Sequence, residues 1–259
     1  MGDNTTISWA MRTFNPWIGC QKVGPGCDNC YAETWDQRFS AGEHWGPGAP
    51  RRRTVESNWN KVRKWQREAL SSGLRSRVFC ASLADVFDNA IDPQWRRDLA
   101  QLIRETPMLD WMLLTKRIGN VQRMIAEDFG GALPGNVWLG ASIVTQAEAD
   151  RDIAKLLAVP ARVRWLSMEP LIEAVAIQPD QMRALDMIVV GGESGGNARH
   201  FDIAWARDLL GQARTGGTAY HFKQLSEADH PRTYEEWDTF PDDLKVREFP
   251  AGTYAPIAA

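Results

Sequence analysis

The sequence has few cysteines and histidines and no long apolar run. It holds four cysteines and four histidines in 259 residues, a poor disulfide framework for a chain of this length. No run of about 18 apolar residues is present, so we expect no transmembrane helix and no membrane partner. The first residues also lack a basic stretch followed by an apolar one. We therefore expect no secretory signal and a cytoplasmic location.

Common nucleotide-binding and zinc-finger motifs are missing as well. The glycine-rich segment at 191–196 is not followed by the Lys-Ser/Thr pair of a phosphate-binding loop. None of the histidines lies at finger-like spacing from the cysteines. The net charge of −3 excludes no class of function. The length fits one α/β barrel.

Three of the four cysteines lie close together near the start of the chain. Cys20, Cys27 and Cys30 follow the pattern C-x6-C-x2-C, and Tyr31 comes directly after the last of them. In a reducing compartment, clustered cysteines usually mean metal or redox chemistry. Three thiolates with no fourth ligand nearby suggest a metal centre with one open coordination position, as in a [4Fe–4S] cluster with one free iron. Two alternatives stay open, a zinc site completed by His44 and unligated or redox-active thiols.

Short apolar runs alternate with helix-compatible stretches along most of the chain. The predicted strands are 77–85, 109–116, 136–142, 163–169, 187–193 and 219–223. The predicted helices are 94–105, 118–128, 147–157, 179–185 and 204–213. Such alternation is typical of βαβ units, and near-continuous apolar strands indicate a parallel sheet that is buried on both faces. The predicted fold class is therefore α/β, with parallel strands and outer helices.

Each predicted strand ends in a polar residue. These residues are Asp85, Lys116, Ser142, Glu169, Glu193 and Lys223. The carboxyl ends of barrel strands form the rim where catalytic and binding groups collect. A further short strand over 13–17 would place the cysteine loop at the same rim.

The segment 51–77 departs in charge from the rest of the chain. It holds nine lysines and arginines against two glutamates, a net charge of +7. The apolar spacing within it predicts an amphipathic basic helix. Its charged side is either a solvated helix face or a phosphate-binding patch for nucleic acid.

Several motifs, in their order along nearly the whole chain, resemble one known family. They are TFNPWIGCQKVGPGCDNCYAE (13–33), LLTKR (113–117), VWLGAS (137–142), MEPL (168–171), VVGGESG (189–195) and HFKQ (221–224). The chain resembles the phage- and prophage-associated radical-SAM-like proteins with a three-Cys motif, which are often encoded beside a three-Cys-motif partner protein. More distantly it is similar to the spore photoproduct lyase branch of radical S-adenosylmethionine enzymes. Most radical enzymes of that kind carry C-x3-C-x2-C, whereas the first gap here is six residues.

The resemblance implies a fold, a reaction type and partners. It implies a single partial (β/α) barrel over 1–225, with the iron–sulfur loop at 20–30, a basic helical insertion at about 51–77, and a tail over 226–259 packed on the core. Cys20, Cys27 and Cys30 would bind the cluster, which reductively cleaves S-adenosylmethionine to a 5′-deoxyadenosyl radical. The implied substrate is nucleic acid or a nucleotide, and an external electron donor and a three-Cys-motif partner protein are implied partners. The reaction could be of lyase, transferase or repair type.

The resemblance also suggests roles for the remaining candidates. The expected cofactor-binding residues are Tyr31, Ser142, Glu169, Gly191, Gly192 and Glu193. The cations expected to face an anionic substrate or the methionyl carboxylate are Lys116, Arg117 and Lys223. The catalytic candidates are Cys80, Asp85 and Lys116. Rival hypotheses are a zinc-stabilised nucleic-acid-binding module that is not an enzyme, and an S-adenosylmethionine-dependent transferase without a cluster.

Overall fold

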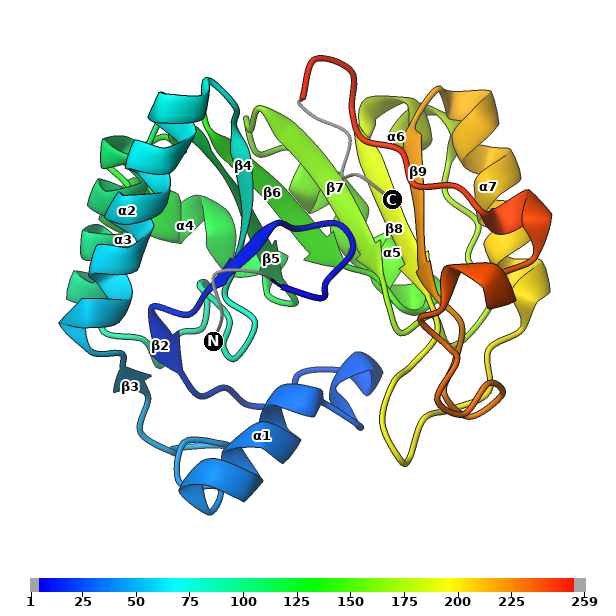
Figure 1. Cartoon of the computed structure of the whole chain (residues 1–259), viewed down its shortest axis with the longest axis horizontal. Helices are drawn as coiled ribbons and strands as arrows, with labels where there is room; N and C mark the ends of the chain where they lie inside the picture. Colours follow the sequence, from blue (N-terminus) through cyan, green and yellow to red (C-terminus); the bar gives the residue numbers. More distant parts are fainter. Residues whose placement is uncertain (1–4, 254–259) are drawn as a thin grey trace.

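A curled, seven-stranded parallel sheet forms the centre of the molecule (Figure 1). The computed structural model describes residues 5–253, and the strand order within them is β1-β4-β5-β6-β7-β8-β9. Every neighbouring pair in this sheet is parallel. All residues of β4, β6 and β8 are buried, as expected of strands covered on both faces. The predicted α/β fold class with a partial barrel is confirmed.

The elements of the half-barrel alternate as predicted. The strands are β1 (Arg12–Phe14), β4 (Ser76–Cys80), β5 (Leu109–Thr115), β6 (Val137–Ser142), β7 (Val163–Met168), β8 (Met187–Gly191) and β9 (Ala219–Gln224). The helices are α1 (Tyr31–Ser40), α2 (Glu56–Ser72), α3 (Pro93–Glu105), α4 (Ile118–Asp128), α5 (Gln146–Leu157), α6 (Pro179–Ala184) and α7 (Ile203–Gly216). A small antiparallel pair joins β2 (Trp17–Ile18) to β3 (Arg52–Arg53). Short 3-10 turns cover Pro25–Cys27, Trp237–Thr239 and Asp242–Leu244.

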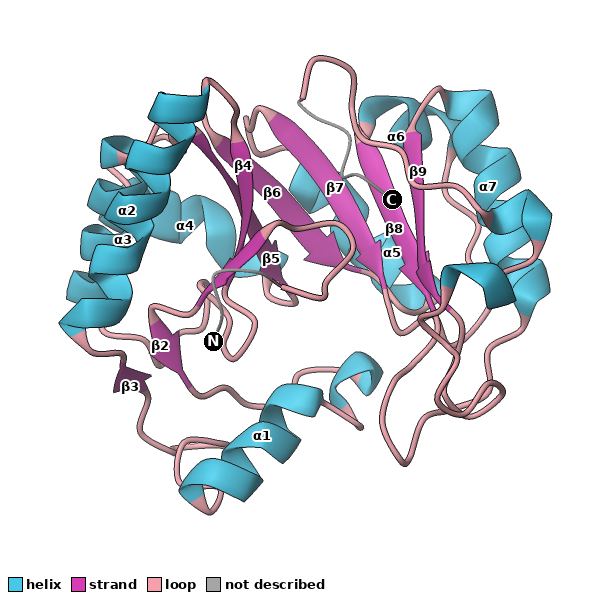
Figure 2. Ribbon diagram, viewed as in Figure 1, coloured by secondary structure: helices cyan, strands magenta, loops and turns pink. Residues whose placement is uncertain are grey.

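Helices α2 to α7 lie on the outside of the sheet (Figure 2). Several begin at a side-chain cap: Asp92, Thr145 and Asp202 each accept a hydrogen bond from a backbone N–H of the first turn. The inner, apolar side of each helix packs on the strands. Between residues 5 and 253, no helix is both long and apolar enough to cross a bilayer.

Aromatic residues pack together on one face of the sheet. Trp9 packs against Phe79 and Trp165, with ring centroids 4.6 and 5.1 Å apart. Gly140 makes room for the Trp165 ring, since a Cβ there would lie 2.4 Å from it. Trp9 and Phe79 also line the cavity at the carboxyl ends of the strands, so these rings form part of its wall.

The first part of the chain differs in detail from the predictions. The strand predicted over 13–17 is two short strands in different sheets, and β4 ends at Cys80, so Asp85 lies in the following loop. Helix α1 was not predicted. It buries only Ala32 and Asp36, so its apolar stripe is too weak to be seen in the sequence.

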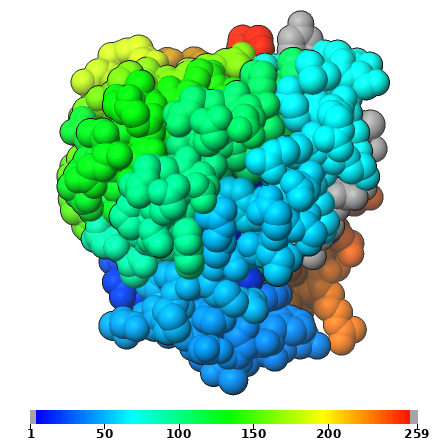
Figure 3. Space-filling view, turned by 90° about the vertical axis from the view of Figure 1, so that its left-hand side faces the viewer, coloured from blue at the N-terminus to red at the C-terminus, as the bar shows by residue number. Residues whose placement is uncertain are grey.

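The basic segment supplies an ordinary outer helix of the half-barrel. Helix α2 lies on the connection between the parallel neighbours β1 and β4. Figure 3 shows this face, with the cyan atoms of α2 above the blue atoms around α1. Within the described residues, at least five of its nine cations pair with acids: Arg51 with Asp88, Arg53 with Asp98, Arg63 with Glu105, Lys64 with Glu68, and Arg75 with Asp110. Much of the positive charge is therefore neutralised within the protein.

The described part of the C-terminal segment packs against β9. The Phe222 N–H donates to the Val246 carbonyl at 2.8 Å, and the Leu225 N–H donates to the Tyr234 carbonyl at 2.9 Å. The Phe240 ring meets the Phe222 ring edge-on, 5.0 Å between centroids. Residues 1–4 and 254–259 of the predicted core and tail lie outside the described residues.

Candidate metal centre and ligand cavity

A cavity of about 560 Å³ opens at the carboxyl ends of the strands. It brings the three clustered cysteines together with most of the predicted rim residues. These lining residues are Cys20, Cys27, Cys30, Tyr31, Asp85, Lys116, Arg117, Ser142, Glu169, Gly192, Glu193 and Lys223. Residues from both ends of the chain therefore meet in one space.

The cysteine loop is fixed by local backbone features. Cys27 ends the 3-10 turn Pro25–Cys27, and Cys30 is the residue before the first turn of α1. Gly19 has a φ of +112°, in the left-handed region, and a Cβ there would lie 2.5 Å from the carbonyl oxygen of residue 44. Gly26 lies against the rim, since a Cβ there would come within 3.1 Å of Val144. Gly19 therefore allows close approach to the segment around residue 44, and Gly26 allows the loop to approach the rim near Val144.

Burial keeps two of these thiols protonated in the protein alone. It raises the pKa of Cys20 to about 11; Asp85 adds to this effect, while Arg117 opposes it. Burial also raises the pKa of Cys30, opposed by backbone N–H groups of the first turn of α1. Metal binding to these sulfurs would therefore release protons.

The donor set fits a soft, thiolate-ligated cluster. All three cysteines are free and line the same cavity, whereas no histidine, His44 included, is among the lining residues. Thiolates are the usual ligands of iron–sulfur clusters, which separate their ligands more widely than a single ion does. Over residues 5–253, no group of three His, Cys, Asp or Glu side chains is placed to hold one metal ion.

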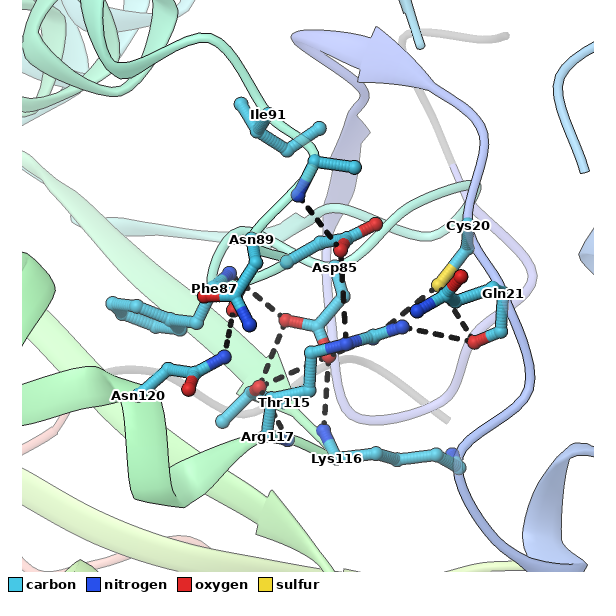
Figure 4. A network of polar contacts seen from close by, with 12 residues as sticks. Cys20, Gln21, Asp85, Phe87, Asn89, Ile91, Thr115, Lys116, Arg117 and Asn120 are labelled. Carbon is cyan, nitrogen blue, oxygen red and sulfur yellow. Dashed lines mark hydrogen bonds and ion pairs between the residues drawn. The ribbon is translucent and has the colours of Figure 1, made fainter. Parts of the chain in front are cut away.

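A buried polar network joins Cys20 to the loop after β4 and to the end of β5 (Figure 4). The Arg117 guanidinium lies 3.4 Å from the Cys20 sulfur through Nη1, and its Nη2 donates to the Gln21 carbonyl at 2.9 Å. The same Nη1 lies 2.9 Å from Asp85 Oδ2. Asp85 was predicted at a strand end, and its loop returns it to the same rim.

The opposite wall of the cavity carries two ion pairs. Lys223, on β9, donates to Glu169, which directly follows β7. Glu193 accepts from Arg199 and, at 3.0 Å, from Asn29 of the cysteine loop. Glu169 is thus held by one cation, whereas Glu193 is already held by several donors.

Two further predicted residues lie on the cavity wall without an acidic partner. Lys116 Nζ lies 3.2 Å from the Ser142 hydroxyl, and no ion pair of Lys116 with a carboxylate is found within residues 5–253. The Tyr31 hydroxyl donates to the Ser82 carbonyl at 2.6 Å, so its ring is tied across the cavity edge. Lys116 is therefore available to an anionic ligand.

Two predicted residues do not reach the cavity. Cys80 is fully buried at the end of β4, and burial raises the pKa of its thiol. Gly191 gives room to Gln224, since a Cβ there would lie 3.1 Å from its carbonyl oxygen. Gly192 lines the cavity, but a Cβ there would lie 2.6 Å from the backbone nitrogen of Ser226. These two glycines serve the packing of neighbouring chain segments.

Some residues of the site were not among those predicted from the sequence. Arg199 and Asn29 were not predicted, although both bind Glu193. Ser167, near the end of β7, and Thr115, at the end of β5, also line the cavity. Only the position of Ser167 and Thr115 at strand ends could have identified them, because their side chains are common in cores.

The profile of the family described as "Protein of unknown function (DUF5131)" matches residues 4–243. No curated protein matches the sequence. Among solved structures, a cysteine-to-serine mutant of spore photoproduct lyase is similar at a TM-score of 0.55 and 14% identity, covering 87% of this chain and 79% of that one. A cysteine-to-alanine mutant with dinucleoside spore photoproduct gives 0.56 and 13%, with the same coverage. The enzyme complexed with dinucleoside spore photoproduct gives 0.53 and 12%, again with the same coverage. At these identities the similarity shows the shared fold.

Proposed function

The chain belongs to the DUF5131 family of proteins of unknown function, and from its own site we propose that it is a radical S-adenosylmethionine enzyme. The observation that carries the proposal is the convergence of Cys20, Cys27 and Cys30 on one cavity at the carboxyl rim of a parallel half-barrel. That rim is where such barrels hold their reactive groups. The fold shared with spore photoproduct lyase supports the same proposal.

The three cysteines would hold a [4Fe–4S] cluster. The chemistry that a bound cluster supplies is one-electron reduction of S-adenosylmethionine, which yields a 5′-deoxyadenosyl radical. The protein would bind and orient the reacting groups and would exclude water from the site. An external donor would deliver the electron.

The chain offers complementary groups for the cosubstrate. Glu169 provides a carboxylate for an ammonium, and Ser142 a hydroxyl for the ribose or the carboxylate of the cosubstrate. Lys116 and Lys223 offer cations to a carboxylate or phosphate. Tyr31 and Gly192 lie on the same wall. Glu193, although predicted as a ligand, is engaged by Arg199 and Asn29 and would instead hold the cysteine loop.

We further propose nucleic acid or a nucleotide as the substrate. The structural neighbours named above include complexes with a dinucleoside. The cavity presents Lys116, Arg117 and Lys223, which suit a phosphate. A three-Cys-motif partner protein, a core over 1–225 and a tail over 226–259 are part of the same proposal.

The test is low-temperature EPR on protein that is purified anaerobically, reconstituted with iron and sulfide, and reduced. A [4Fe–4S]⁺ signal that changes on adding S-adenosylmethionine supports the proposal. Release of 5′-deoxyadenosine, followed by chromatography, gives a second readout. Stoichiometric zinc with no cluster signal would overturn the radical mechanism and favour a zinc-stabilised binding module.

A further inference from the structure

Arg117 is held in one position by contacts on three sides. Its Nη1 faces the Cys20 sulfur at 3.4 Å, and its Nη2 donates to the Gln21 carbonyl at 2.9 Å. Its third contact is the Asp85 carboxylate, at 2.9 Å. The side chain is only 8% exposed. A buried guanidinium held in this way presents a fixed positive charge to the sulfur.

Asp85 is fully engaged in holding this arrangement. Its two oxygens accept from the Thr115 hydroxyl at 2.8 Å, the Phe87 N–H at 2.9 Å and the Lys116 N–H at 3.1 Å, besides the guanidinium (Figure 4). The residue is 5% exposed. These donors hold the Asp85 carboxylate in one orientation, with Oδ2 facing the Arg117 guanidinium.

The charge around Arg117 is nearly balanced without Cys20. Asp88 lies 3.9 Å from Arg117 Nε, and Asp88 itself pairs with Arg51 at 3.0 Å. Two buried carboxylates therefore face two guanidinium groups. A negative sulfur at Cys20 would add a third negative group beside Arg117, at the same Nη1 that donates to Asp85.

The three cysteines differ in this respect. Cys20 has the guanidinium, whereas the donors to Cys30 are backbone N–H groups of Ala32 and Glu33. Among the hydrogen bonds of residues 5–253, neither Cys27 nor Cys30 has a bond with a cationic side chain. Lys116 acts on Cys30 by its charge alone, without a hydrogen bond to the sulfur. Cys20 is thus the cysteine of the three with a hydrogen-bonded cation in the described part of the chain.

We propose that Asp85 is a positioning residue that fixes the Arg117 guanidinium against the Cys20 sulfur and thereby raises the reduction potential of a cluster bound there. This inference rests on the proposed function. A hydrogen-bonding cation beside a ligating sulfur stabilises the more negative, reduced cluster. The charge of Asp85 acting directly would do the opposite, so the two roles predict opposite signs.

The experiment is a redox titration followed by EPR on reconstituted protein, in a double-mutant cycle. We expect R117M to lower the ratio of reduced to oxidised cluster at a fixed potential by about tenfold, which is about 59 mV for one electron. We expect D85N to lower it in the same direction, because the guanidinium loses its anchor. The double variant D85N/R117M should match R117M. The control R123M removes an exposed arginine of the same helix and should leave the potential unchanged.

A second variant guards against misfolding. R117K keeps a positive charge but replaces the planar guanidinium by a single ammonium. It should therefore assemble the cluster and lower the reduction potential less than R117M does. The iron content of each variant shows whether the cluster is assembled, and circular dichroism shows whether the protein is folded.

The outcomes distinguish this inference from the proposed function. A potential that rises in D85N, or effects of D85N and R117M that add, would overturn the positioning role. Unchanged potentials in R117M and R117K would overturn it as well. A folded wild type that takes up no cluster would overturn the proposed function and this inference together, and would be seen before any variant is compared.

Discussion

Glu193 and Arg199 form a two-pronged ion pair beside the cysteine loop. Arg199 Nη2 lies 2.7 Å from Glu193 Oε1, and Nε lies 2.9 Å from Oε2. The same guanidinium donates to the Pro25 carbonyl at 3.1 Å, and Asn29 donates to Glu193 at 3.0 Å. The pair therefore links the end of β8 to the loop that carries Cys27 and Cys30.

Glu193 should make the stability depend on pH in the acid range. Burial disfavours its charge, but hydrogen bonds from Arg199 and Asn29 outweigh burial and lower its pKa. A lowered pKa in the folded state stabilises fully above the ordinary carboxyl pKa of about 4.3, and this contribution is lost as the pH falls through the folded value. We expect E193Q to cost about 1.5–3 kcal/mol at pH 7 and less at low pH. Urea unfolding at pH 7 and at a pH below the ordinary carboxyl pKa measures the free energy of unfolding, and the exposed Glu236→Gln change is the control. An equal cost at both would contradict the prediction.

The four cysteines should separate into two groups on reconstitution. Replacing Cys20, Cys27 or Cys30 by alanine should abolish the visible absorbance of the cluster, because each lines the cavity. C80A should keep the cluster and cost about 1 kcal/mol of unfolding free energy, because it only empties a small volume in the core. Iron and sulfide analysis with thermal unfolding checks both. A cluster that survives the replacement of Cys20, Cys27 or Cys30, or that is lost in C80A, would show that the ligands are misassigned.

Glu169 should matter for binding more than for folding. E169Q keeps the size of the side chain but removes the charge offered to an ammonium, so we expect the affinity for S-adenosylmethionine to fall about tenfold, or about 1.4 kcal/mol. Equilibrium dialysis with the reconstituted protein measures it. The matched control is E173Q, which changes an exposed glutamate a few residues further along the chain after β7. This variant should bind S-adenosylmethionine as the wild type does. Equal affinities for both variants would remove Glu169 from the site.

Two glycine-to-alanine changes should act in opposite directions. G140A places a Cβ 2.4 Å from the buried Trp165 ring, and we expect a loss of about 1–3 kcal/mol. G211A lies in α7 with no atom within 4 Å of the added Cβ, and we expect a gain of about 0.5–1 kcal/mol. Urea denaturation of both variants is the measurement. A stable G140A would mean that the Trp165 ring can move.

Much of the fold follows from local patterns, whereas part of the site does not. Apolar runs such as 109–116 and 163–169 predict their strands because both faces are buried, and strand ends predict where Lys116 and Glu169 lie. The pairing of Glu193 with Arg199 depends on how a loop folds back, which periodicity does not encode. The packing of Gly191 against Gln224 likewise depends on the tertiary structure, since a glycine beside a neighbouring strand looks the same in sequence as one beside a ligand.

The hydrogen bond between Asn29 and Glu193 joins residues that are 164 positions apart. During synthesis, the thiols of the cysteine loop emerge long before β8 and the arginine that secures it. Domains generally fold as units. The contacts that hold the cysteine loop against Glu193 can therefore form only after β8 has been synthesised.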